Sequence, residues 1–341
     1  MYEWVKRLFS GARAPAPAPR PVAPAPAPAP TLAPAATPSQ LQFDQRDTVN
    51  ENFYHWLFNT AESGGFDLTP VETQVIDALL AILQGQQSGA ALVRRMPGLI
   101  PQLMQSLRSD SFSGAQLSRM ISHDVVLVAA IIRLANSSFL GNGQHIGSVE
   151  HAVMVIGQEG LRQLITTVAF RPIIDVNSGP FTRSIAPRLW DQSERCAVAS
   201  RSLAASLGAD PFEGFLAGLL QNVGLIVSLR ILDQSAKDGK GIGSVLFTSQ
   251  LMGIARELAV NIGREWDFPP AVIAAVGEQG NVQKGARLSP LGQLLALSDY
   301  LSKMKLLAEA ERLATGDPRL FRGLSPEALA CFATLNAPAA D

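Results

Sequence analysis

Two adjacent carboxamides, Gln221 and Asn222, interrupt an apolar run that reads AGLLQNVGLIV. Apolar residues recur at helical spacing on both sides of the pair, which predicts one helix over residues 211–232. Because the run itself contains no charged residue, this helix is predicted to be buried on most sides. We therefore expect both amides to project into a packed interior or an enclosed pocket, where each unmet hydrogen bond would cost roughly 1–3 kcal/mol.

The chemistry open to this pair is limited by its lack of charge. A divalent cation that activates water for attack on phosphorus needs imidazole or carboxylate ligands. Histidine cannot supply them in the second half of the chain, because all four histidines precede residue 152. They are His55, His123, His145 and His151. The only literal His-Asp dipeptide, His123-Asp124, precedes a predicted helix, and we assign Asp124 to its N-cap.

Helical periodicity continues through most of the chain after residue 40, without a sustained strand alternation, and predicts an all-α fold. Apolar residues make up 47% of the chain, enough for a buried core, and the net charge of −1 gives no strongly basic field for nucleic acid. Cys196 and Cys331 lie outside any metal-ligand spacing, so we expect two reduced thiols. No window approaches the ~20 consecutive apolar residues of a membrane span.

Several motifs together resemble one family. The segment LLQNVGLIV looks like the LLHDIG helix of HD-type phosphohydrolases, with Gln221-Asn222 in place of His-Asp. The wider sequence resembles the HDOD family, bacterial relatives of HD and HD-GYP domains that are implicated in signalling. The supporting segments, in the family's order and spacing, are PGLIPQL (Pro97–Leu103), DVVLVAAIIRLANSSFLG (Asp124–Gly141), IGSVEHAVMVIGQEGLRQL (Ile146–Leu164), LWDQSERCAVASRSLA (Leu189–Ala204) and REWDFPPAVIAAV (Arg264–Val276).

The resemblance implies a multi-helix HDOD fold whose metal-ligand positions no longer carry ligands. The family often has a histidine after a Leu-Trp pair, where this chain has Gln192. It often ends the core in a histidine pair, where this chain has Glu278 and Gln279. Together with Gln221 and Asn222, these residues form a predicted degenerate pocket, for which we expect neither a metal nor another cofactor.

Two other functions stay open at this point. A divergent phosphohydrolase could hold Mg²⁺ through carboxylates alone, and such a site requires Asp191 and Glu278 to converge on one cavity. The carboxylates in the relevant segments are Asp191, Glu194, Glu213 and Glu278. The other alternative is a sensor that binds a nucleotide, such as a cyclic dinucleotide, without hydrolysing it.

Three further residues are candidates for a structural or interaction role. Asn136 and Ser137 follow an apolar helix, and we expect their side chains to terminate it by bonding to the backbone. A contact between two halves of the domain is the alternative for them. Trp266 lies at a predicted helix boundary and is interpreted as a core anchor.

The N-terminal region differs in composition from the rest. Residues 13–40 are rich in alternating Ala and Pro, which predicts an extended, solvated linker. Before it, residues 1–12 form a predicted amphipathic docking helix, which could bind a membrane surface, a groove on a partner or its own domain. Its candidate contact residues are Trp4, Val5, Lys6, Arg7, Leu8 and Phe9.

The predicted organisation continues with a helical extension over residues 41–95, an HDOD domain over residues 96–285 and a C-terminal helical segment over residues 286–341. The predicted function is a non-catalytic signalling module that acts by binding cytoplasmic signalling proteins, with residues 1–12 as a second contact. We expect a cytoplasmic location and no nucleic-acid partner. Recruitment to a membrane or a partner by the N-terminal helix is left open.

Overall fold

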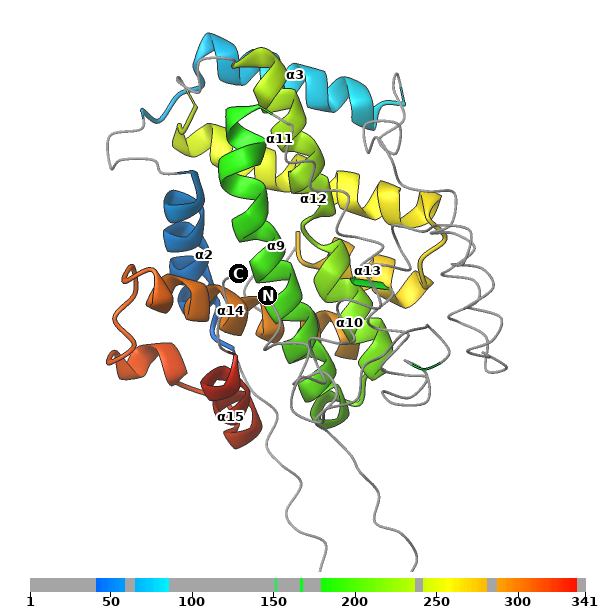
Figure 1. Ribbon diagram of the computed structural model, residues 1–341, viewed down its shortest axis with the longest axis vertical. Helices are drawn as coiled ribbons and strands as arrows, with labels where there is room; N and C mark the ends of the chain where they lie inside the picture. Colours follow the sequence, from blue (N-terminus) through cyan, green and yellow to red (C-terminus); the bar gives the residue numbers. More distant parts are fainter. Residues whose placement is uncertain are drawn as a thin grey trace, which may run out of the picture.

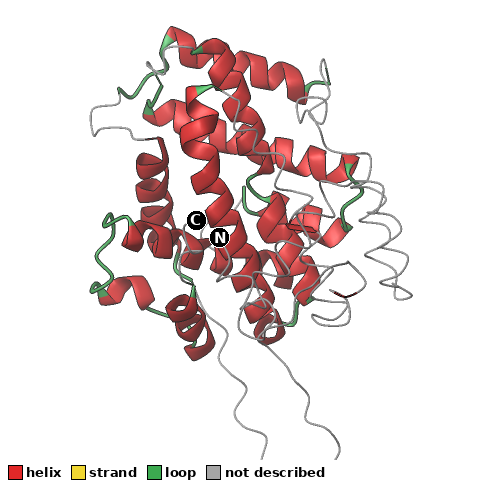
Figure 2. Cartoon of the chain, viewed as in Figure 1, coloured by secondary structure: helices red, strands yellow, loops and turns green. Residues whose placement is uncertain are grey.

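The computed structural model describes residues 41–58, 65–85, 151, 166–167, 179–236, 242–280 and 287–335. These residues form helices and connecting turns without a β-strand, which confirms the predicted all-α class (Figure 2). The helices are α2 (Phe43–Phe58), α3 (Pro70–Leu83), α9 (Pro180–Leu203), α10 (Pro211–Leu220), α11 (Val223–Ser235), α12 (Val245–Glu265), α13 (Pro270–Glu278), α14 (Pro290–Glu309) and α15 (Pro326–Thr334), with short 3₁₀ turns η2 (Ala204–Leu207) and η3 (Pro318–Phe321).

Some predictions fall outside the described residues. These are the linker over residues 13–40, the docking helix over residues 1–12 with Trp4, Val5, Lys6, Arg7, Leu8 and Phe9, and the proposed helix terminators Asn136 and Ser137.

Six of the nine described α-helices carry a proline in the first turn, and in four of these six a Ser, Thr or Asp comes just before it. Proline has no backbone N–H to leave unpaired at this position, and a Ser, Thr or Asp side chain accepts a hydrogen bond from one of the free N–H groups. In α15 the hydroxyl of Ser325 accepts from the backbone N–H of Ala328 at 3.3 Å, with Pro326 first in the helix. Side-chain caps of the same kind open α3, α10, α12 and α14.

Helix α9 lies at the centre of the arrangement and packs against α10, α11 and α14 (Figure 1). It begins at Pro180 and extends to Leu203. The start is capped from another helix: the carboxylate of Asp233 in α11 accepts from the N–H groups of Phe181 at 2.8 Å and Thr182 at 3.2 Å. A Cβ on Gly179 would lie 2.6 Å from the Asp233 carboxyl group, so glycine is needed at this close approach.

The predicted single helix over residues 211–232 is wrong in one respect, because the structure divides it into α10 and α11 at Gln221 and Asn222. Asn222 has φ −97° and ψ −1°, which ends the regular helix geometry. Gly218 and Gly224, on either side of the break, let α10 pack closely on α9 and α11 pack closely on α12. A Cβ on Gly218 would lie 2.5 Å from the backbone of Ala197 in α9, and one on Gly224 would lie 1.8 Å from the Ala255 carbonyl oxygen in α12.

The same stretch is also a candidate for a membrane-crossing helix by length and composition. Residues Pro211–Ser235 are long enough, and contain an 18-residue window apolar enough, with a mean hydropathy of 1.8, to cross a membrane, although they include no run of ~20 consecutive apolar residues. However, 83% of their most apolar window is buried inside the protein, and core helices pass the same composition test. The break at Gln221 and Asn222 divides the stretch further, so we interpret it as a pair of core helices.

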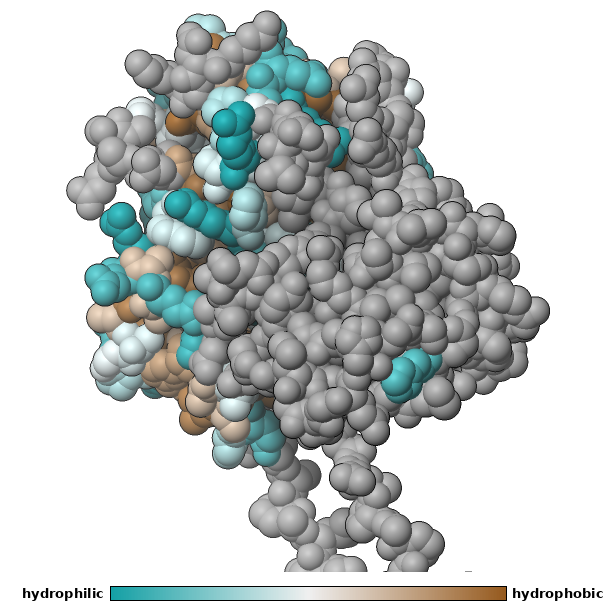
Figure 3. Space-filling model, in the orientation of Figure 1, coloured by the Kyte–Doolittle hydropathy of each residue, from teal (hydrophilic) through white to brown (hydrophobic). Residues whose placement is uncertain are grey.

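Apolar side chains from all the helices meet in one core, which contains both cysteines. Cys196 and Cys331 are buried and free. Burial raises the pKa of Cys331 to about 12, and it raises that of Cys196 well above the ordinary value. Both thiols are therefore protonated packing groups. Over the described part of the face in Figure 3, hydrophilic and hydrophobic residues are interspersed.

A buried carboxylate ties α3 to α12. Glu72 is fully buried and reaches back to accept from the N–H of Thr69 at 2.8 Å, which completes a capping box. Its other oxygen accepts from the N–H groups of Gly243 at 2.7 Å and Ser244 at 2.8 Å, at the start of α12. Burial raises the pKa of Glu72, but these donors lower it by more, so the net pKa lies below the usual value of 4.5.

We expect Glu72→Gln to lower the free energy of unfolding at neutral pH by about 1.5–3 kcal/mol, the range for hydrogen bonds to a charged group. Because the folded pKa is depressed, this contribution is fully present above the unfolded pKa near 4.5 and is lost as the pH falls through the lower folded value. Urea unfolding between neutral and acid pH should therefore show the two proteins converging below about pH 4.5. The exposed Glu257→Gln is the control and should change little.

Candidate functional site

The break between α10 and α11 opens onto a cavity of about 240 Å³. Its walls come from five places in the chain: α2, the α10–α11 junction, α12, α13 and α14. Of the predicted pocket residues, Gln221, Asn222 and Gln279 line this cavity. The first two are half-buried, not enclosed in packed interior, because they form its rim.

Gln192 does not line the cavity but lies in the packed interior beside it, where it is fully buried in α9. Its side-chain Nε2 donates to Asp299 Oδ1 and to Ser302 Oγ, both at 2.9 Å and both in α14. Its Oε1 accepts from Asn222 and, at 3.5 Å, from Gln221. This one amide therefore links three helical segments.

Asn222 turns its amide group towards α9. Besides Gln192, its Nδ2 donates to Ser193 Oγ at 2.9 Å and lies 3.5 Å from the backbone oxygen of Leu189. These partners satisfy the side-chain nitrogen of the half-buried Asn222. The side-chain nitrogen is thus used for bonds within the protein.

Asp299 and Lys303 were missed by the sequence analysis, although both line the cavity. They form a salt bridge of 2.8 Å, with only 8% and 5% of their side chains exposed. Lys303 Nζ also donates to Asn50 Oδ1 at 2.7 Å, and it lies 5.0 Å from the centre of the Tyr54 ring, both in α2. The available signal was an Asp and a Lys four residues apart in a helix that carries no charged residue before the Asp.

The charge state of Lys303 follows from these neighbours. Burial alone lowers the pKa of a lysine, because it disfavours the charged form. Here the Asp299 carboxylate and the Tyr54 hydroxyl raise it by more, and the net pKa of Lys303 lies above its ordinary value. Lys303 is therefore an ammonium at neutral pH, and Asp299 faces a fixed positive charge.

Gln279 belongs to the opposite wall. Its Nε2 donates to the backbone oxygens of Ala275 at 2.9 Å and Gly292 at 3.0 Å, and its Oε1 accepts from Arg46 Nη2 at 2.9 Å. Its sequence neighbour Glu278 lies outside the cavity lining and accepts from the backbone and hydroxyl groups of Ser289. The predicted pocket is thus split, with four residues in or beside the cavity and Glu278 capping α14.

The carboxylates considered for a magnesium site are engaged elsewhere. Asp191 pairs with Arg195 at 2.7 Å, and Glu194 accepts from the ring N–H of Trp190 at 2.6 Å. Burial raises the pKa of Asp191 by more than Arg195 lowers it. Asp191 and Glu278 do not line the cavity, so the required convergence is not found there. Within the described ranges, no cluster of three His, Cys, Asp or Glu side chains is arranged to hold a metal.

Trp266 occupies the position predicted for it. It follows the last turn of α12, only 4% of it is exposed, and its ring centre lies 6.4 Å from that of Phe268. This is the setting of a core residue.

Comparison with known proteins decides the family. The model of the HDOD domain matches residues 93–282, more than half of the chain. The chain belongs to the HDOD domain family. A sequence relative is an uncharacterised protein from Treponema pallidum (strain Nichols), 22% identical over 200 residues, which are 58% of this chain and 34% of that protein. The HDOD chain thus spans about a third of the length of this curated relative.

Solved structures of similar fold include two at low sequence identity. An HDOD domain protein of unknown function from Geobacter sulfurreducens has a TM-score of 0.50 and 20% identity, covering 67% of this chain and 77% of its own. A protein from Marinobacter aquaeolei VT8, provisionally described as a signal transduction protein, has a TM-score of 0.52 and 18% identity, covering 87% and 64%. At these identities the likeness establishes the HDOD fold.

We expect Lys303→Met and Asp299→Asn each to lower the free energy of unfolding, with Lys303→Met costing about 3–5 kcal/mol because it leaves a buried carboxylate unpaired. The double variant should be more stable than the sum of the two losses predicts, because the second change removes the charge that the first exposed. Urea unfolding of the four proteins measures this coupling. Lys305→Met, on the same helix but stacked on Phe332, should cost about 1 kcal/mol or less.

Proposed function

We propose that this HDOD chain is a non-catalytic signalling module that acts by binding other proteins. The observation that carries the proposal is how the carboxylate of Asp299 is bonded. This carboxylate beside Gln221 and Asn222 is held by the Gln192 amide and by the Lys303 ammonium at 2.8 Å. A divalent cation at Asp299 would have to approach a fixed positive charge or displace it.

The donors around Asp299 also fit a metal poorly. Gln192 and Asn222 present N–H groups to their neighbours, and an N–H group cannot coordinate a cation. In the second half of the chain no histidine is available. We infer that hydrogen bonding and an internal ammonium fulfil the role that metal coordination has in catalytic HD domains.

Support for a signalling role comes from relatives. One solved structure of the same fold is provisionally described as a signal transduction protein. Another, from Shewanella amazonensis SB2B with a TM-score of 0.50 and 19% identity, is provisionally described as a metal-dependent phosphohydrolase. The separate positions of Asp191 and Glu278 favour the first role for this chain over a carboxylate-held magnesium enzyme.

Metal analysis and a phosphodiesterase screen on the pure full-length protein test the non-catalytic assignment. We expect no stoichiometric Fe, Mn or Mg and no turnover of phosphate mono- or diesters after incubation with each metal. Stoichiometric metal together with turnover that Asn222→Ala abolishes would refute it. Asn261→Ala, on the surface side of α12 near Arg264, is a matched control for that substitution.

The proposed contact through residues 1–12 has its own test. Deleting these residues should leave the unfolding transition unchanged, because the Ala/Pro-rich segment over residues 13–40 is expected to be an extended linker that separates them from the helical core. The same deletion should abolish recruitment to the partner or the membrane, measured by pull-down and by localisation of the tagged protein in cells, where we propose a cytoplasmic location. Unaltered recruitment after the deletion would show that residues 1–12 are not the contact. Replacing Lys6 and Arg7 alone tests whether the contact depends on charge, because only a charge-driven contact should then be lost.

A further inference from the structure

The cavity has an excess of positive charge that the bonds described so far do not use. Three cations line it, Arg46, Arg256 and Lys303, against two carboxylates, Asp47 and Asp299. Lys303 and Asp299 neutralise each other in their salt bridge. Asp47 is exposed, so water screens its charge. The two arginines therefore dominate the field inside the cavity.

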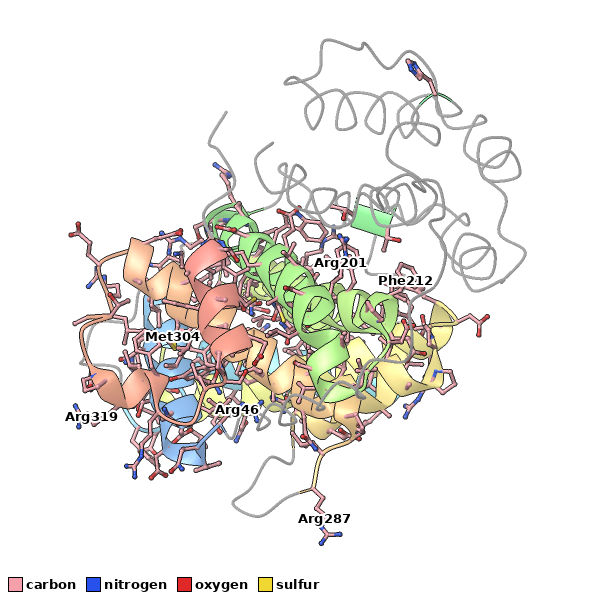
Figure 4. The ribbon with its side chains drawn as sticks, turned by 90° about the horizontal axis from the view of Figure 1, so that it is seen from below. Arg46, Arg201, Phe212, Arg287, Met304 and Arg319 are labelled. Carbon is pink, nitrogen blue, oxygen red and sulfur yellow. The ribbon has the colours of Figure 1, made fainter. Side chains whose placement is uncertain are left out.

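The surroundings of Arg46 disfavour its positive charge. Its Nη2 donates to Gln279, but its buried Nε has no hydrogen-bond partner among the described residues. Burial lowers the pKa of Arg46, and the charge of Arg256 lowers it further, while Asp299 raises it. Figure 4 shows Arg287 and Arg319 pointing away from the helices, whereas Arg46 lies among them. A buried guanidinium beside a second one is costly unless an anion shares their donors.

Arg256 faces the same space from α12. Among the described residues it forms no salt bridge, and it lies close over the end of α13, where a Cβ on Gly280 would come within 2.9 Å of its Nη1. These two guanidinium groups, one from α2 and one from α12, offer planar pairs of N–H donors. Such pairs match the oxygens of a phosphate or a carboxylate.

The rest of the lining is mixed, with the carboxamides of Asn50, Gln221, Asn222 and Gln279 and the Tyr54 hydroxyl beside a smaller apolar part. Leu225, Met252 and Val276 come from α11, α12 and α13, and Phe43 adds a ring that is 42% exposed at the α2 side. The volume of about 240 Å³ corresponds to roughly eight water molecules in the liquid and lies below the 300–1,000 Å³ of most ligand pockets. An occupant must therefore be compact.

We propose that this cavity binds a small molecule with one anionic head group, a phosphate monoester or a carboxylate, on a compact apolar body. Arg46 and Arg256 bind the head group, and Leu225, Met252 and Val276 contact the body. The occupant contacts α2, the α10–α11 junction and α12 together, so its affinity depends on how these three elements pack against one another. This inference goes beyond the protein-binding role and does not depend on it.

Calorimetric titration of the full-length protein tests the proposal with three probes: phenyl phosphate, benzoate and inorganic phosphate. We expect phenyl phosphate or benzoate to bind, and the one that binds more tightly identifies the head group. Inorganic phosphate should bind more weakly than phenyl phosphate, because it cannot use the apolar wall. Arg256→Gln should weaken binding by about tenfold or more, the loss expected for one charge-assisted hydrogen bond.

Arg264→Gln is the matched control, since it removes the same charge from an exposed position on the same helix. It should leave the dissociation constant within about twofold. The proposal is overturned if neither phenyl phosphate nor benzoate binds, if inorganic phosphate binds as tightly as phenyl phosphate, or if the two arginine variants weaken binding equally. Release of phenol from phenyl phosphate would instead contradict the non-catalytic assignment and leave the anion site standing.

Discussion

The side-chain amide of Gln192 is the interaction on which the site depends. It is fully buried in the central helix, and it bonds at one end to α14 and at the other to the α10–α11 junction. Because an amide both donates and accepts, one neutral side chain can satisfy a carboxylate on one side and carboxamides on the other. An apolar residue of similar size would leave Asp299 and Asn222 without these partners, at a cost that exceeds any gain in packing.

The pairing of Asp299 with Lys303 adds a second constraint. A buried carboxylate must be neutralised, and in this chain the neutralising charge is covalently part of the same helix. Lys303 in turn needs α2, whose Asn50 and Tyr54 share its ammonium. The Lys303 ammonium therefore adds polar contacts to the apolar packing of α2, and α2 supplies Arg46 to the cavity wall.

The sequence predicts the helical class and many of the helix starts, because period, proline and capping residues are local signals. The pair Ser325-Pro326 at the start of α15 is an example of such a local signal. The break at Gln221 and Asn222 could not be predicted, because glutamine and asparagine are also found inside helices. The break follows from contacts of Gly218 and Gly224 with other helices, which lie far away in the sequence. The arginines of the cavity were missed for a similar reason. Arg46 and Arg256 are more than 200 positions apart, and only the tertiary packing brings them together.

The position of α2 and α3 has a consequence for where this protein can be divided. Both helices precede the segment that matches the family, and α14 follows it, yet α2 packs on α14 and α3 packs on α11 and α12. The carboxylate of Glu72 in α3 also caps the start of α12. A polypeptide trimmed to the family boundaries would lack two walls of the cavity, α2 and α14, and with α14 it would lose both Asp299 and Lys303. The segment that matches the family model is therefore shorter than the length of chain that packs into this core.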